Sequence, residues 1–182
     1  IRNNGGGIVD EAINILKLIT DKGDTLLITK DKNENEKKDL SYIYKITELI
    51  TNNNSGIINA LKENIMKSDS DDDCWLSMVD LLDEEGYAFG IDYKCELEDF
   101  LWALKQLKTY SLIDINLSSL NLNENEDVES WGEEINTALG GRAYICMIDI
   151  DSDSYELIIV NADVYEKISH IAESNGHTID DL

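Results

Sequence analysis

Two short stretches of this sequence combine charged and hydroxyl side chains at a spacing that could support chemistry. The first is Ile91–Lys94 (IDYK), an Asp-x-Lys triplet that follows an apolar run. The second is Met147–Val160 (MIDIDSDSYELIIV), which places Asp149, Asp151 and Asp153 at alternating positions. Aspartates this close together suit a metal loop, a catalytic carboxylate cluster or the turn of a β-hairpin.

The metal-loop interpretation fails at the ligands that matter most. An EF-hand loop needs Gly at its sixth position and a bidentate Glu at its twelfth. Counted from Asp149, these positions hold Ser154 and Val160, and the flanking runs have strand character. We therefore expect no metal and no cofactor, and we expect Asp149 and Asp151 to lie on a polar sheet face or edge beside a turn.

The Asp-x-Lys triplet is similar in form to the second half of a PD-(D/E)xK nuclease site. In that alternative, Asp92 would bind Mg²⁺ and Lys94, on the same strand face, would position the attacking water. A further acid would have to come from Asp80 or Asp83, which fall on a predicted helix, or from the aspartates near residue 150. A metal-dependent enzyme that uses Asp92 and Lys94 with Asp149 or Asp151 is therefore the second hypothesis.

Charge is the strongest compositional feature of the 182 residues. The formal net charge is −23, and almost all of it lies after residue 66: residues 1–66 carry nine basic and ten acidic side chains, whereas residues 67–182 carry six and twenty-eight. Such a surface repels phosphate, so nucleic acid and anionic membranes are disfavoured as partners, and basic proteins are favoured. Solubility alone is the plainer explanation of the same charge.

Cysteine usage and hydropathy bear on the compartment. The three cysteines, Cys74, Cys95 and Cys146, are widely spaced and form neither a zinc motif nor a disulfide framework. No apolar run approaches the length needed to span a bilayer. We therefore expect a cytoplasmic protein.

Hydrophobic periodicity predicts a helical first third and an acidic α/β remainder. Residues 1–66 are expected to hold helices at Ile8–Ile19, Leu40–Ile50 and from Ser55 onward, and to pack on an acidic core domain at 67–182 in one compact domain. The elements expected in the core domain are helices at 75–85, 97–108, 128–139 and 162–175, and strands at 87–93, 112–117, 142–150 and 155–160.

The predicted fold class is α+β, a mixed α/β arrangement. Strand-helix-strand units favour parallel neighbours, whereas the last two strands are close enough to form an antiparallel hairpin. A roughly four-stranded mixed sheet with helices packed on it follows. Trp75 and Trp131 are expected in the core, whereas Trp102 falls between the inward-facing Leu101 and Leu104 and is expected to be partly exposed.

Two segments resemble a family of small bacterial proteins known only as a domain of unknown function. Cys74–Lys108 carries a Trp-Leu helix, a Gly-Tyr strand start, Asp-Tyr-Lys and a Leu-Trp helix, and Asp149–Val160 carries Asp-x-x-Ser-Asp-Ser-Tyr before an apolar strand. In such proteins a Pro often follows that strand; here Asn161 stands there and is expected to cap the next helix. The resemblance implies no activity. It implies that the signature positions form either a shared site or a structural framework: Asp92, Lys94, Asp149, Ser152, Asp153, Ser154 and Tyr155.

The leading hypothesis is a non-enzymatic binding module for a basic protein, comparable to an immunity protein that neutralises a basic toxin nuclease. The residues expected to bind are acidic and aromatic side chains with one lysine among them: Asp92, Tyr93, Lys94, Trp102, Asp149, Asp151, Asp153 and Tyr155. A third hypothesis is a structural or regulatory domain with no partner preference.

Overall fold

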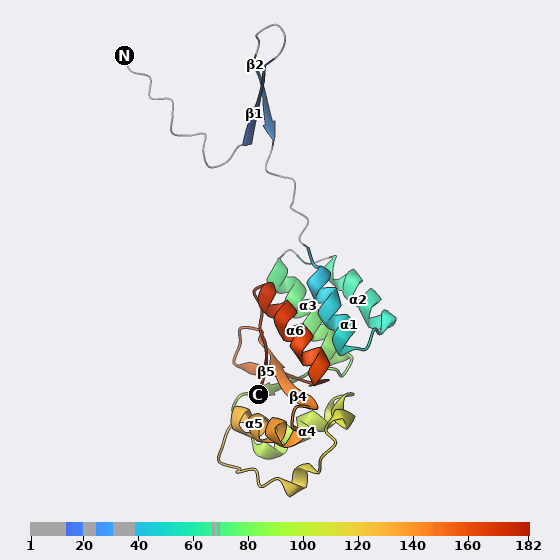
Figure 1. Ribbon diagram of the computed structural model, residues 1–182, viewed down its shortest axis with the longest axis vertical. Coiled ribbons are helices and arrows are strands. Elements are labelled where there is room, and N and C mark those ends of the chain that lie inside the picture. The colour runs from blue at the N-terminus through green and yellow to red at the C-terminus, as the bar shows by residue number, and fades with distance from the viewer. Residues whose placement is uncertain (1–13, 20–24, 31–38, 67, 69) are drawn as a thin grey trace, which may run out of the picture. The chain divides into compact units, whose positions relative to one another are not determined.

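The computed structural model describes residues 14–19, 25–30, 39–66, 68 and 70–182 (Figure 1). Contacts divide the chain into two units, Ile1–Asp39 and Leu40–Leu182. In the first unit, β1 (Asn14–Ile19) and β2 (Thr25–Lys30) pair antiparallel.

The helix predicted over Ile8–Ile19 is wrong for residues 14–19, and residues 8–13 lie outside the described part of the chain. Helical spacing and strand alternation are easily confused in a short apolar run. The deciding signal is the second apolar run, TLLIT, which follows a turn-like Asp-Lys-Gly-Asp sequence, because two such runs around a turn are typical of a β-hairpin.

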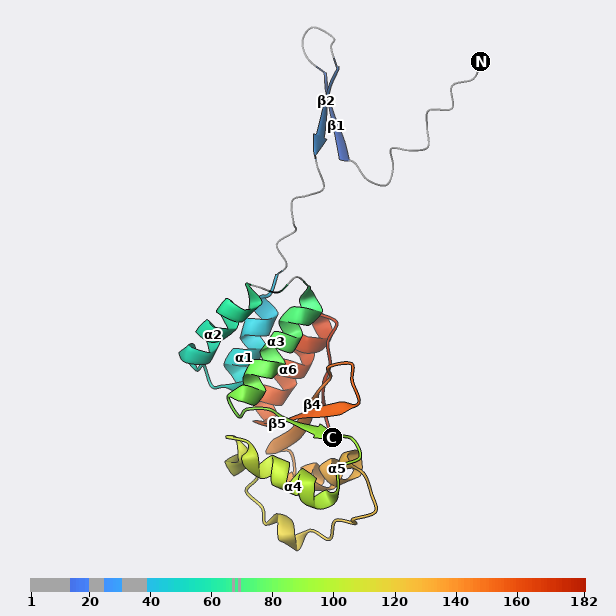
Figure 2. The same cartoon turned by 180° about the vertical axis from the view of Figure 1, so that it is seen from behind.

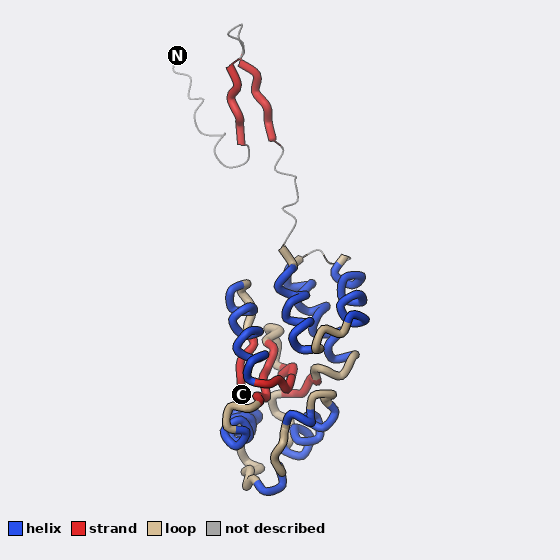
Figure 3. Tube along the Cα trace, turned by 45° about the vertical axis from the view of Figure 1, so that its right-hand side comes forward, coloured by secondary structure: helices blue, strands red, loops and turns tan. Residues whose placement is uncertain are grey.

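The described residues of the second unit form six helices and four strands. Figure 3 distinguishes the helices from the strands by colour. The helices are α1 (Ser41–Ile50), α2 (Ser55–Ile65), α3 (Asp71–Glu84), α4 (Leu97–Gln106), α5 (Val128–Leu139) and α6 (Ala162–Ser174). The strands are β3 (Phe89–Asp92), β4 (Ala143–Ile148), β5 (Ser154–Asn161) and β6 (Ile179–Asp181). Short 3₁₀ turns lie at Tyr110–Leu112 and Leu117–Ser119.

Side-chain caps and glycines define the helix ends. Ser70 and Asp73 form a reciprocal capping box at the start of α3, and the side chain of Asn161 accepts the Val164 N–H at the start of α6, as predicted. Gly86 and Gly140 end α3 and α5 with φ of 68° and 60°, a backbone region that favours glycine.

The four strands form a sheet of order β3-β5-β4-β6 in which all neighbours are antiparallel. The predicted β4–β5 hairpin is confirmed, and the expectation of a mixed sheet is wrong. Because β5 is antiparallel to both β3 and β4, those two strands run in the same direction, as a strand-helix-strand unit requires. They are not neighbours, because β5 lies between them.

The strand predicted over Leu112–Leu117 is wrong, although its pattern is real. Ile113 and Leu117 are buried while Asp114 and Asn116 are exposed, so the alternation seen in the sequence survives as alternating burial. The segment lies between the two 3₁₀ turns and pairs with no strand of the described chain. The alternation therefore reflects a segment that packs one side against the core, not a strand that pairs with a neighbour.

Helices cover both faces of the sheet (Figures 1 and 2). The first core joins α1, α2, α3 and α6 to one face and includes Trp75. The second core joins α4 and α5 to the other face and includes Trp131. Both tryptophans are buried, as predicted. Along β5, Leu157 and Ile159 enter the second core while Ile158 and Val160 enter the first, so this strand is apolar at every position of that run.

Asn136 extends the hydrogen bonding of β4 beyond β6. Its side chain donates from Nδ2 to the carbonyl oxygens of Ile145 (2.9 Å) and Leu182 (2.8 Å), and its Oδ1 accepts the Ile145 N–H at 2.7 Å. Asn136 is buried, so water cannot replace these bonds without rearrangement.

We predict that Asn136→Ala lowers the free energy of unfolding by about 2–3 kcal/mol, because the buried Ile145 N–H loses its acceptor, whereas the Ile145 carbonyl oxygen keeps only its bond from the Leu182 N–H. Urea unfolding measures the change, and the exposed Asn121→Ala serves as the control. A loss as small as that of the control would contradict the structural role.

Candidate functional site

The Asp92–Lys94 segment forms a turn at the end of β3. Asp92 is paired with Ser154 of β5, and its Oδ1 accepts the backbone N–H of Lys94 at 2.8 Å. The Lys94 ammonium lies 4.7 Å from the ring centroid of Tyr93, a cation–π arrangement. The Tyr93 N–H donates to the carbonyl oxygen of Asp153 at 3.4 Å, so the predicted residues of this segment do meet the start of β5.

This geometry does not bring together the residues that a nuclease-like metal site would need. The strand ends at Asp92, so Lys94 does not follow it on a strand face as expected. Asp80 and Asp83 lie beside Gly90 and Glu156 in a separate hollow. Among the described residues, no group of three or more His, Cys, Asp or Glu side chains is arranged to hold a metal ion.

The aspartates near residue 150 form the turn of the β4–β5 hairpin. Asp149 Oδ1 accepts the N–H of Asp151 at 2.8 Å, and Ser152 Oγ accepts the N–H of Ser154 at 3.0 Å. Asp151 has a φ of 55°, which aspartate tolerates better than most residues. The side chains thus serve the backbone of the turn, as the hairpin interpretation predicts.

The backbone of Asp149 also ties the turn to the first core. Its N–H donates to the Thr178 carbonyl oxygen (3.1 Å), and its own carbonyl oxygen accepts the indole N–H of Trp75 (2.9 Å).

Tyr155 links β5 to α5 rather than facing open solvent. Its hydroxyl donates to Glu129 at 2.8 Å. Partial burial and, secondly, this hydrogen bond raise the pKa of Tyr155 to about 12. The hydroxyl therefore stays protonated at neutral pH and acts as a structural donor.

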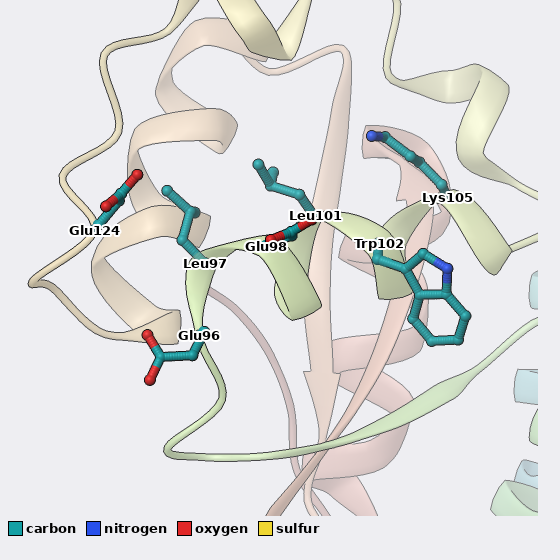
Figure 4. A pocket seen from close by; sticks show the side chains of 7 residues that line it. All are labelled: Glu96, Leu97, Glu98, Leu101, Trp102, Lys105 and Glu124. Carbon is teal, nitrogen blue, oxygen red and sulfur yellow. The ribbon is translucent and has the colours of Figure 1, made fainter.

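Trp102 is exposed on α4, at 53% of its surface. Its ring meets Phe89 of β3 edge to face, with the centroids 5.4 Å apart and the planes at 86°. It lines an open hollow of about 610 Å³ together with six other residues: Glu96, Leu97, Glu98, Leu101, Lys105 and Glu124. Figure 4 shows Trp102 and Lys105 at one end of this hollow and Glu96, Leu97 and Glu124 at the other.

The eight predicted binding residues therefore occupy separate places. Asp92, Tyr93, Lys94 and Asp153 meet where β3 ends and β5 begins. Asp149 and Asp151 lie at the turn beside Trp75, and Tyr155 and Trp102 contact α5 and Phe89, respectively. Pairing of β3 with β5 brings the first group together, and Asp153 of that group shares the β4–β5 turn with Asp149 and Asp151.

A cluster around His177 was missed by the sequence analysis. His177 stacks on Trp75 with centroids 4.1 Å apart and planes within 6° of parallel. Its Nε2 lies 3.0 Å from the Tyr42 hydroxyl and 3.3 Å from Asp71 Oδ2. Burial and, secondly, Asp71 raise the pKa of Tyr42 well above its ordinary value. Tyr42 and His177 are 135 residues apart in the sequence, so no local motif could predict their contact.

Glu156 is a second feature that the pattern did not reveal. It lies on β5 opposite Gly90, so close that a Cβ at Gly90 would lie 2.8 Å from Glu156 Oε1. Burial and, secondly, the charges of Asp83 and Asp80 raise its pKa from 4.5 to about 7.

Fold and candidate site together define an acidic α+β domain: a four-stranded antiparallel sheet between two helical layers, with aromatic side chains exposed among carboxylates. None of the described helices is long and apolar enough to cross a membrane.

Comparison with known families places the chain. The family model described as "Domain of unknown function (DUF6630)" matches residues 13–182, so the chain belongs to this family, which has no established activity. The resemblance noted in the sequence is thereby confirmed. No curated protein and no solved structure matches the chain significantly.

Because the aspartates serve the hairpin turn, we predict that divalent cations do not change the stability of the protein. Ca²⁺ or Mg²⁺ at millimolar concentration should leave the melting temperature nearly unchanged. Specific binding at a cation concentration of 100 times Kd would instead raise the free energy of unfolding by about 2.7 kcal/mol, and the melting temperature with it. Differential scanning fluorimetry measures the shift. A rise of that size that disappears in Asp151→Asn would show a metal site instead.

Glu156 predicts a pH-dependent stability. Because its folded-state pKa is raised, the folded protein disfavours the charged form, and stability falls as pH rises from about 4.5 to about 7. Glu156→Gln should therefore stabilise the protein at pH 8, by about 1 kcal/mol after allowance for solvent screening, and not at pH 4. Thermal unfolding at both pH values tests this, with the exposed Glu166→Gln as control. An equal gain at both pH values would contradict the electrostatic cause.

Proposed function

We propose that this chain is a non-enzymatic protein-binding module that recognises a basic partner protein. The observation that carries the proposal is the half-exposed Trp102 beside three exposed glutamates, Glu96, Glu98 and Glu124. An exposed tryptophan supplies a large apolar anchor and a face for a cation, and the carboxylates favour lysine or arginine over acidic groups.

The position of Trp102 supports a role as an anchor. Its edge-to-face contact with Phe89 supports one side of the indole from the sheet, which limits the conformational freedom lost when a partner binds. Lys105 is the only basic residue that lines the described hollow, so the local charge remains negative.

The charge of the rest of the chain would act at longer range. Residues 67–182 carry an excess of twenty-two acidic side chains, which raises the rate of encounter with a basic protein at low salt. One class of partner that fits is a basic toxin nuclease, which an acidic immunity protein would neutralise. No observation favours the metal-dependent alternative, because Asp92 holds the turn and Lys94 lies over Tyr93.

The test uses a fluorescent peptide of alternating Lys, Arg and Gly residues and stopped-flow kinetics. We predict that Trp102→Ala weakens binding about 30-fold, as expected for an anchor residue worth about 2 kcal/mol. Met66→Ala, which removes the exposed methionine after α2, is the matched control.

The on-rate should fall steeply between 0.1 M and 1 M salt, because the Debye length shrinks from about 10 Å to about 3 Å. Replacing Glu96, Glu98 and Glu124 by Gln should lower the on-rate at 0.1 M salt more than replacing the exposed Glu63, Glu84 and Glu173. Salt-independent association, or equal effects of the two triple variants, would contradict the proposal.

A further inference from the structure

The outer edge of β3 presents backbone hydrogen-bonding groups that no neighbouring strand uses. β3 lies at the edge of the sheet and pairs on one side only, with β5. Just past its end, the Tyr93 N–H donates to the Asp153 carbonyl oxygen, which continues the ladder in register. Backbone groups alternate in direction along an antiparallel ladder. Those of Ile91 therefore face β5, and those of Gly90 face outward.

Gly90 makes this edge accessible. Glycine has no side chain, so the exposure of Gly90 is exposure of its backbone. Neither its N–H nor its C=O bonds to a group of the described chain outside the β3–β5 ladder. The strand carries neither the lysine nor the proline that commonly protects such an edge. A glycine within a strand also marks a place where another backbone can approach closely.

Three carboxylates lie beside Gly90 on the face of the sheet that α3 covers. Glu156 is opposite Gly90 on β5, and Asp80 and Asp83 of α3 lie with it around a hollow of about 240 Å³. No lysine, arginine or histidine of the described chain lines this hollow. Directly opposed residues of two strands share a face, so a residue that paired with Gly90 would direct its side chain here. The charge of the hollow favours a basic side chain at that position.

The opposite face of the same edge is apolar and aromatic. The strand, the green arrow of Figure 2, runs between α3 and α4. Phe89 packs on the second core, and the half-exposed Trp102 of α4 lies edge to face against it. Residues on either side of one that paired with Gly90 would point toward this face, because side chains alternate along a strand. The two faces together favour a segment in which basic and apolar residues alternate.

A second copy of this chain is a poor occupant for the edge. Antiparallel pairing of two β3 strands would bring the carboxylates of both copies onto one face, and each chain carries a formal net charge of −23. Like charges that meet in an interface cost free energy, whereas the same carboxylates attract a basic segment. Charge complementarity therefore selects the basic partner.

We propose that the basic partner binds as an added strand. An extended segment with alternating basic and apolar residues pairs antiparallel with β3, its basic side chains toward Glu156 and α3 and its apolar side chains toward Trp102. This inference rests on the proposed function and specifies how the partner is held. Backbone bonds to Gly90 supply affinity that many sequences share, whereas the two unlike faces select the alternation.

Backbone methylation of a peptide tests the pairing without altering the protein. The probe is the blocked, fluorescently labelled hexapeptide Gly-Lys-Leu-Arg-Leu-Gly, and its binding is measured by fluorescence anisotropy at low salt. In the proposed pairing, the N–H groups of its lysine and arginine face β3, and those of its two leucines face away. N-methylation of the lysine and arginine should weaken binding about tenfold or more, because the outward groups of β3 lose their partners. N-methylation of both leucines is the matched control and should weaken binding less than about twofold.

Hydrogen exchange of the full chain gives an independent readout. The Gly90 N–H should exchange freely in the free protein and at least about tenfold more slowly when the peptide saturates it. The Ile91 N–H, which already bonds to β5, should change little. Slow exchange of the Gly90 N–H in the free chain that disappears on dilution would show instead that a second copy occupies the edge.

Variants of the protein locate the basic side chains. Replacing Asp80 and Asp83 by Asn should weaken binding of the unmethylated peptide about fivefold, as expected for the loss of two partly exposed charge pairs. Replacing the exposed Asp163 and Glu173 by Asn and Gln removes the same charge elsewhere and should have a smaller effect. Equal effects of the two double variants would contradict the assigned face.

Equal effects of the two methylations, or a larger effect of leucine methylation, would overturn the added strand. If Trp102→Ala still weakens binding of the unmethylated peptide in that case, the proposed function stands and the mode of binding is wrong. A peptide that does not bind at low salt contradicts the proposed function and this inference together.

Discussion

Burial of the β4–β5 hairpin on both faces is the constraint from which the arrangement of the molecule follows. Alternate side chains of β5 enter two different cores, so helices must cover both sides of the sheet. The hairpin also occupies the centre of the sheet, with β3 and β6 at its edges. Every candidate functional residue in this unit therefore lies at a strand end, on a turn or on the outside of a helix.

The same constraint determines where the acidic charge can lie. Two apolar cores leave few positions where a carboxylate is tolerated without a partner. Most of the acids accordingly lie at helix starts and turns, as the capping box at Ser70 and the Asp149 turn illustrate. Glu156 is the exception, because it lies on a central strand and shares its surroundings with Asp80 and Asp83, which raises its pKa. The two helical layers thus leave most acidic side chains on the surface. At the hollow beside Trp102, three of these acidic side chains lie near an aromatic ring.

Sequence patterns predicted the local elements well and the long-range contacts poorly. Helix α5 was predicted with its bounds unchanged, and the hairpin turn followed from the alternation around Asp149 and the short Ser-Asp-Ser link. The predicted direction of β3 relative to its neighbour was wrong, because hydrophobic periodicity does not reveal which strands pair with each other. The three-residue strand β6 was not predicted, because the sequence IDD lacks the alternation of a strand. This segment is a strand only because it pairs with β4. The His177 cluster was beyond reach for the same reason, since it joins three distant segments.

The contact between Tyr42 and His177 has a consequence for how the protein matures during synthesis. The two residues are 135 positions apart, and α1 packs against α6 in the same core. At a translation rate of about 5–20 residues per second, the apolar face of α1 leaves the ribosome roughly 7–27 seconds before its partner exists. During that interval α2 and α3, which belong to the same core and follow α1 closely in the chain, can already cover part of its apolar face, whereas the part that packs on α6 stays uncovered.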